Sequence, residues 1–226
     1  MEIEQVSLEF VMTLRSSHEV NAVILFGSQA ANTARPDSDV DLLVIVESGF
    51  EQTARSYMGR LFEVTFVTEK STCDWWRSNP DHCVMLWRNA KVLHSKANTA
   101  KRLMQFAAAI EEEGKSAMSS TDIVKRHRAA AYQMDSLEAL AIRDPLAANL
   151  VLGEKMAVYV GDYFSVRGLW LPAPKERPAM IRSLDDQVGA LLDTFAQPAS
   201  ELDRKFAVAR ELINSIFQIT EKTDIQ

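Results

Sequence analysis

Two aspartates stand one residue apart at the start of one of the most hydrophobic segments of the chain. Asp39 and Asp41 lead into the apolar run LLVIV at residues 42–46. Alternate residues of a β-strand point to the same side, so we expect both carboxylates to project together. Two like charges held side by side repel each other unless a cation neutralises them. The spacing therefore indicates a divalent-metal site, and Mg²⁺ prefers carboxylate oxygens.

A Gly-Ser pair lies upstream of these acids, directly after the earlier apolar run NAVILF. Gly27 would let a phosphate approach the backbone, and Ser28, opening a helix, would offer a hydroxyl and free N–H groups to an anion. A metal beside a phosphate cradle is what phosphoryl chemistry requires. The structural alternative is a turn, because RPDSD at residues 35–39 has good turn composition. Paired carboxylates combined with Gly-Ser after a strand favour the metal and phosphate interpretation.

The residues Gly-Ser at 27–28, ten intervening residues and Asp-Val-Asp-Leu at 39–42 resemble the signature of the DNA polymerase beta-type nucleotidyltransferase superfamily. In that family two acids on one strand bind the metal-nucleotide, and a third acid lies on a neighbouring strand. The resemblance implies that Glu63, in LFEVTFV, is the third acid. The later MLWRNAKVLHS, at residues 85–95, resembles the end of the minimal catalytic domain, so the match covers roughly residues 1–95.

The strand pattern around the third acid has two interpretations. The Phe-Val-Phe stripe of RLFEVTFVT faces one way, so Glu63 faces the other and is free to join the aspartates. A polar residue on a half-exposed strand would give the same alternation. Two features depart from the family pattern. Ala31-Asn32 stands where relatives often have Arg-Gly, and the third acid is Glu, as in antibiotic nucleotidyltransferases, rather than the Asp of many polymerases.

Hydrophobic periodicity predicts a small α/β unit in the first part of the chain. The residues at 48–59 are expected to form a connector, and those at 28–36 a short helix or turn. Helices are expected at 3–16 and at 70–90, the second broken at Asn79-Pro80. The predicted strands are NAVILF (21–26), DVDLLVIV (39–46), RLFEVTFVT (60–68) and the edge strand KVLHS (91–95).

After residue 97 the pattern becomes helical, and SSTD at 119–122 has the form of a capping box. GLWLPAPKERP at 168–178 contains three prolines and is predicted to be an ordered loop. We therefore predict an α+β fold: a nucleotidyltransferase-type mixed sheet flanked by helices at residues 1–97, then an all-helical bundle domain at 98–226 that would select the acceptor. The predicted helices lie near residues 98–114, 119–143, 145–166, 185–195 and 199–221.

The composition is that of a globular protein. The 226 residues are 47% hydrophobic, and their formal net charge of -6 disfavours a nucleic-acid partner. The spacing of Cys73 and Cys83 suits no common metal site or disulfide framework, so we interpret both as reduced thiols. The N-terminus lacks a signal-peptide pattern, and LLVIV is far shorter than a membrane span. These features predict a cytoplasmic protein. The sequence leaves the oligomeric state open, and a homodimer is one alternative.

The resulting functional prediction is Mg²⁺-dependent transfer of a nucleoside monophosphate from an NTP to an acceptor hydroxyl, and ATP is the NTP that we expect. Asp39 and Asp41 would hold the metal, Gly27 and Ser28 the phosphates, and Glu63 would be a metal ligand or a general base. The helical domain, with its Trp-Leu-Pro-x-Pro-Lys segment, resembles the C-terminal domains of kanamycin-type nucleotidyltransferases, which implies a small aminoglycoside-like acceptor. The alternatives are nucleotidylation of a protein or RNA, as in toxin–antitoxin systems, and a non-enzymatic nucleotide sensor.

Basic residues of the helical region are further candidates for binding the triphosphate. Lys155 and Lys175 are the candidates for this role, and Lys175 lies in the proline-stiffened segment. The cluster KRHR at residues 125–128 has two interpretations. It either contributes to phosphate binding or forms a solvated helix face, and His127 aligns with apolar positions as a packed histidine would.

Overall fold

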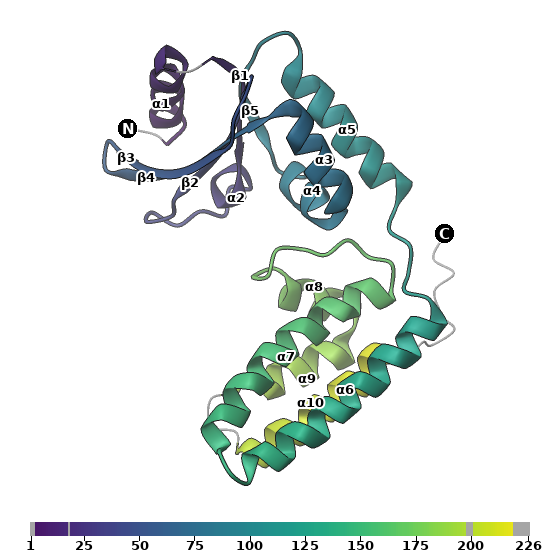
Figure 1. Cartoon of the computed structure of the whole chain (residues 1–226). Coiled ribbons are helices and arrows are strands. Elements are labelled where there is room, and N and C mark those ends of the chain that lie inside the picture. The colour runs from purple at the N-terminus through teal and green to yellow at the C-terminus, as the bar shows by residue number, and fades with distance from the viewer. Residues whose placement is uncertain (1–2, 18, 198–200, 219–226) are drawn as a thin grey trace. The chain divides into compact units, whose positions relative to one another are not determined.

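The computed structural model describes residues 3–17, 19–197 and 201–218, and the chain divides into two compact units, Met1–Gly114 and Lys115–Gln226 (Figure 1). The first unit is a sheet with helices on both faces, which confirms the predicted α+β class. Its elements are α1 (Ile3–Ser17), β1 (Val20–Phe26), α2 (Gly27–Ala30), β2 (Val40–Val46), β3 (Glu51–Tyr57), β4 (Arg60–Thr68), α3 (Glu69–Ser78), α4 (Pro80–Trp87), β5 (Lys91–Ser95) and α5 (Thr99–Glu113).

The sheet has the strand order β3-β4-β2-β1-β5. β2 and β4 pair in parallel, whereas the pairs β1–β2, β1–β5 and β3–β4 are antiparallel, so the sheet is mixed. Because β2 and β4 run in the same direction, their first residues meet at one end of the sheet. That end carries the acidic residues selected from the sequence.

Each face of the sheet packs against its own set of helices. On one face, Phe10 and Leu14 of α1 pack on a stripe that includes Phe62 and Val64. On the other face, Trp76 of α3 and Leu103 of α5 belong to a second core. The alternation of each strand therefore separates two apolar layers, and the side chains of Asp41 and Glu63 follow the strand positions that face α3–α5.

The predicted connector at residues 48–59 is wrong, because β3 (Glu51–Tyr57) occupies most of it and pairs with β4. The sequence EQTARSY has no apolar alternation, since β3 is an edge strand that is exposed or half-buried throughout. The β3–β4 turn has left-handed backbone angles at Met58 (φ 47°) and Gly59 (φ 74°), as two-residue hairpin turns require. Edge strands that bury little apolar surface leave a weak hydrophobic signal.

The second unit is a helical bundle around one apolar core. Ser119 caps the first of its helices by accepting a hydrogen bond from the backbone N–H of Asp122 at 3.1 Å, as the capping-box pattern predicted. Asp144 caps the next helix in the same way, through the N–H of Ala147. The helices are α6 (Ser120–Ala141), α7 (Pro145–Val166), α8 (Arg177–Leu184), α9 (Asp186–Phe195) and α10 (Leu202–Phe217).

Two features of the helical region differ from the sequence-based expectation. The loop predicted at 168–178 ends in α8, because Pro178 lies at the start of that helix, where a missing N–H is tolerated. α5 packs on the sheet of the first unit through Ala100 and Leu103, so the compact units divide after Gly114 rather than near residue 97. Of the helix expected at 199–221, residues 199–200 and 219–221 lie outside the described residues. No helix in the described part of the chain is long and apolar enough to span a membrane.

Candidate active site

Three carboxylates converge where β2 and β4 begin. Asp41 and Glu63 are direct partners in the parallel register, and Asp39 immediately precedes β2. Each residue offers one carboxylate oxygen, and these three oxygens lie within 4.8 Å of one another. Asp39 and Asp41 are half-buried and Glu63 is exposed. The structure therefore brings together the three acids that the sequence selected.

The chemistry of this donor set fits a divalent cation. Carboxylate oxygens are the ligands of hard cations, and Mg²⁺ is commonly held by one or two carboxylates while its other positions remain open to water and phosphate. Three carboxylates at this distance would repel one another strongly without a positive charge between them. We therefore assign Asp39, Asp41 and Glu63 as the candidate metal-binding group.

Gly27 lies in direct contact with this group. Its φ of 69° is in the left-handed region, and a Cβ placed on it would lie 2.0 Å from Oδ2 of Asp41. Any larger residue would therefore displace the carboxylate or distort the backbone. The approach is fixed by the β1–β2 ladder, in which Phe26 is the partner of Asp41.

Ser28 follows within the short helix α2 and is half-buried. Its carbonyl oxygen accepts a hydrogen bond from the N–H of Thr33 at 3.0 Å, which closes the segment back on itself. Asn32, at one of the two positions where the sequence departs from Arg-Gly, has a φ of 56°, which asparagine tolerates better than most residues. Lys91 of β5 donates a hydrogen bond to the Asn32 side chain at 2.9 Å. The segment after Gly27 is therefore an ordered turn beside the acids.

A cleft of about 660 Å³ opens next to the carboxylates, on the sheet face that packs against α3 and α4. We call it the aromatic cleft, because Phe50, Trp75 and His82 line it. Asp41, Glu63 and Leu86 belong to the same lining. Desolvation lowers the pKa of His82 below its ordinary value, which favours the neutral imidazole. The volume lies in the range of sites for small organic molecules.

Sequence reasoning missed the aromatic part of this cleft. Of the adjacent pair Trp75-Trp76, only Trp76, which is 1% exposed, is a core residue. Trp75 is 45% exposed and contacts His82 edge to face, with ring centroids 4.6 Å apart. Adjacent residues of a helix point about 100° apart, so a Trp-Trp pair cannot place both rings in the same layer. That geometric rule was the available signal.

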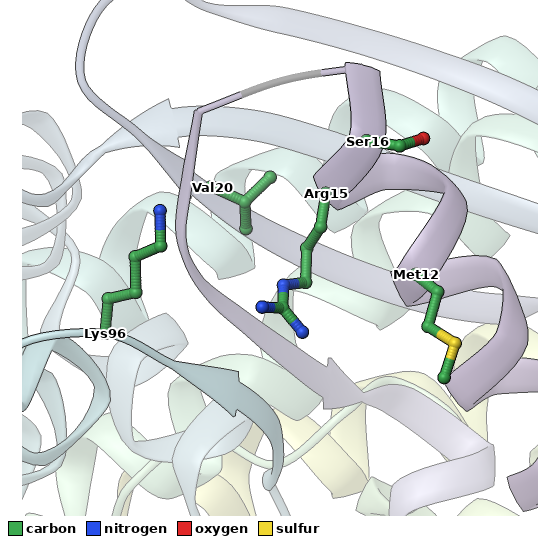
Figure 2. A pocket seen from close by; sticks show the side chains of 5 residues that line it. All are labelled: Met12, Arg15, Ser16, Val20 and Lys96. Carbon is green, nitrogen blue, oxygen red and sulfur yellow. The ribbon is translucent and has the colours of Figure 1, made fainter.

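A second, smaller pocket of about 240 Å³ lies beside the end of α1 (Figure 2). In Figure 2, Arg15 of α1 and Lys96, which follows β5, border the same space, together with Met12, Ser16 and Val20. None of its described lining residues belongs to the acidic group or to the Gly-Ser turn. We therefore place the candidate chemistry in the aromatic cleft.

The basic candidates lie in the second unit. Lys155 is in α7, and its Nζ lies 3.9 Å from Oε1 of Glu154. Lys175 is exposed in the segment before α8. Their assignment to the triphosphate stays a prediction.

The KRHR cluster at residues 125–128 is largely engaged within the helical bundle. Lys125 pairs with Asp122 at 3.8 Å, and Arg126 pairs with the buried Asp162 at 2.8 Å. His127 hydrogen-bonds the side chain of Asn214 at 2.9 Å and stacks on a phenylalanine ring of α10. Arg126 and His127 therefore join α6 to α7 and α10, whereas the pair of Lys125 with Asp122 lies within α6 itself.

A family model described as a nucleotidyltransferase domain matches residues 8–106 of the chain, a span that contains the Gly-Ser turn and all three acids. Residues 8–106 belong to the nucleotidyltransferase domain family. The match begins within α1 and ends within α5, so the nucleotidyltransferase domain lies inside the first compact unit.

The fold of the whole chain is similar to that of a nucleotidyltransferase-like protein from Exiguobacterium sibiricum 255-15. The two chains are 12% identical and superpose with a TM-score of 0.51, over 96% of this chain and 74% of the other. At that identity the likeness concerns the fold, which here includes helices beyond the nucleotidyltransferase domain. None of the curated proteins compared with this chain matches it.

Proposed function

We propose that this chain transfers a nucleoside monophosphate from Mg²⁺-bound ATP to a hydroxyl group of a small-molecule acceptor. The observation that carries the proposal is the convergence of Asp39, Asp41 and Glu63 within 4.8 Å. This cluster lies inside a nucleotidyltransferase domain and against the Gly27 turn. A nucleotide sensor would not require a third acid that reaches the same point from another strand.

The proposed roles follow from the position of each side chain. Asp39 and Asp41 would hold the metal ion, which would supply positive charge to the phosphates as negative charge develops on them. Gly27 would leave the backbone open to the phosphates, and Ser28 would donate its hydroxyl to one of their oxygens. Glu63 is the most exposed of the three acids, and we assign it as the general base.

The reaction balances as a single displacement. The acceptor oxygen forms a bond to the α-phosphorus of ATP, while the bond from that phosphorus to the bridging oxygen of the β-phosphate breaks. The hydroxyl proton passes to the Glu63 carboxylate, and pyrophosphate leaves with both electrons of the broken bond. The products are a nucleotidylated acceptor and pyrophosphate. We also propose that the helical unit takes part in selecting the acceptor.

Two differently labelled ATP preparations test the proposal. The full-length protein is incubated with Mg²⁺ and a pool of hydroxyl compounds, with the label either at the α- or at the γ-phosphate. We expect the α-label to move onto an acceptor and the γ-label to appear in pyrophosphate, with both processes stopped by a chelator. Release of the γ-label as inorganic phosphate would show hydrolysis instead. Transfer of the α-label to a protein or RNA would show that the acceptor is a macromolecule and not a small molecule.

A further inference from the structure

The aromatic cleft next to Glu63 restricts the kind of molecule that can serve as acceptor. We propose that the acceptor is an uncharged hydroxyl compound with a flat aromatic face, held against Trp75 and Phe50 with its hydroxyl at Glu63, and that it is not a polycationic aminoglycoside. This inference rests on the proposed function for the identity of the reaction. It replaces the aminoglycoside-like acceptor suggested by the helical domain.

The first observation is the chemistry of the walls. Phe50 is 69% exposed and Trp75 is 45% exposed, and both line the cleft. Leu86 adds an aliphatic surface. Exposed large apolar side chains gathered in one concave site indicate a binding surface for an apolar group. The edge-to-face contact with His82, whose ring lies at 73° to that of Trp75, restricts the orientation of the indole. A flat ligand would therefore meet an oriented aromatic surface.

The second observation is the charge of the lining. Among the described lining residues, Asp41 and Glu63 are the acidic ones, and the proposed reaction uses both of them. The neutral polar groups include Gln52 and Thr65, whose side chains lie 3.5 Å apart on the neighbouring strands β3 and β4. A compound with several ammonium groups would have to bury them without further carboxylates, which is unfavourable. Neutral donors and acceptors instead suit hydroxyl or carbonyl groups.

The third observation is the position of the cleft relative to the phosphate turn. The cleft contacts Asp41 and Glu63, whereas its described lining does not include Gly27 or Ser28. The space therefore reaches the assigned general base directly, and it meets the turn assigned to the phosphates only through Phe26 and Asp41. A general base must lie within hydrogen-bond reach of the proton that it accepts. This location suits the acceptor better than the triphosphate.

Direct binding of a probe tests the cleft without relying on turnover. We would titrate the full-length protein with 2-naphthalenemethanol, an uncharged aromatic alcohol, and separately with kanamycin, following each by calorimetry in the absence of nucleotide. We expect the aromatic alcohol to bind, and we expect the same affinity when that titration is repeated in the presence of kanamycin. Trp75→Ala and Phe50→Ala should each weaken binding by about three- to tenfold, as expected for loss of one aromatic contact. Tyr132→Ala, which removes a 72% exposed ring of α6, is the matched control and should change nothing.

Transfer kinetics then assign the bound compound to the acceptor. With α-labelled ATP, Trp75→Ala should raise KM for the aromatic alcohol and leave KM for ATP unchanged. If Trp75→Ala instead raises KM for ATP, the cleft holds the nucleobase and the inference is wrong. It is also wrong if kanamycin is nucleotidylated while aromatic alcohols neither bind nor react, although the proposed function would then stand. Absence of label transfer to every acceptor would reject the proposed function itself.

Discussion

At the level of single residues, the Asp41 carboxylate occupies the space that a side chain at position 27 would need. The 2.0 Å between Oδ2 of Asp41 and the Cβ position of Gly27 is far below any real contact. The glycine therefore has two functions, because it adopts the left-handed backbone of the turn and allows Asp41 to reach the acidic group. The family-like Gly-Ser signature and the Asp-x-Asp motif are thus coupled by direct contact.

Substituting this glycine tests the coupling. We expect Gly27→Ala to abolish nucleotidyl transfer, because the new methyl group displaces Asp41, and to destabilise the protein by about 1–2 kcal/mol through the left-handed backbone. Gly59→Ala is the matched control, since Gly59 also has a positive φ of 74° but nothing lies within 4 Å of its Cβ position. Its loss of stability should be similar while its transfer rate stays normal. Equal rates for the two variants would contradict the coupling.

Glu63 permits a separation of binding from chemistry. If it is the general base, Glu63→Gln should leave Mg²⁺-dependent ATP binding nearly unchanged and lower kcat by about 10²–10⁴-fold. Calorimetric titration with MgATP and single-turnover transfer measure the two quantities separately. Loss of binding in parallel with the rate would show that Glu63 acts mainly as a metal ligand.

At the level of elements, the parallel pairing of β2 with β4 is what brings the acids together. The period-2 pattern of RLFEVTFVT predicted the side to which Glu63 points, and its proximity to Asp41 follows from the register. Sequence reasoning could not find β3, because an exposed edge strand buries too little apolar surface to need alternating apolar and polar residues. It also missed Trp75 in the cleft, since burial of a tryptophan depends on where α3 lies on the sheet. Strong hydrophobic periodicity was sufficient to predict β1, β2, β4 and the long helices.

The contact between α6 and α7 provides a test of the helical unit. Asp162 is 6% exposed, and burial raises the pKa of its carboxyl although Arg126 partly opposes this. Arg126→Met should lower the free energy of unfolding by about 1–3 kcal/mol at pH 7, because it leaves a buried carboxylate unpaired. The loss should shrink at pH 5, because the pKa of Asp162, already raised, rises further without the guanidinium, and protonation removes the unpaired charge.

Urea unfolding at the two pH values measures this difference. Lys125→Met serves as the control, because Lys125 forms an exposed pair with Asp122 and should contribute less than about 0.5 kcal/mol. A loss for Arg126→Met that is as large at pH 5 as at pH 7 would show that the ionised state of Asp162 is not the cause.

At the level of the whole molecule, ligand binding should raise the thermal stability of the protein. We expect MgATP to raise Tm more than ATP with a chelator does, because a ligand stabilises the state to which it binds. Asp39→Asn should remove most of the Mg²⁺-dependent part of this shift, since it removes one charge of the acidic group. Thermal unfolding that is indifferent to ATP and Mg²⁺ in the wild-type protein would argue against a metal-nucleotide site.

The most direct test of nucleotidyl transfer compares two neighbouring aspartates in the α-label assay. Asp41→Asn removes a charge from the acidic group, whereas Asp37→Asn makes the same change at an exposed residue that pairs with Arg35 at 3.6 Å. With Mg²⁺ and the acceptor pool, we predict label transfer by the wild-type protein and by Asp37→Asn, and none by Asp41→Asn. Transfer by purified Asp41→Asn at the wild-type rate would contradict the assignment of the active site.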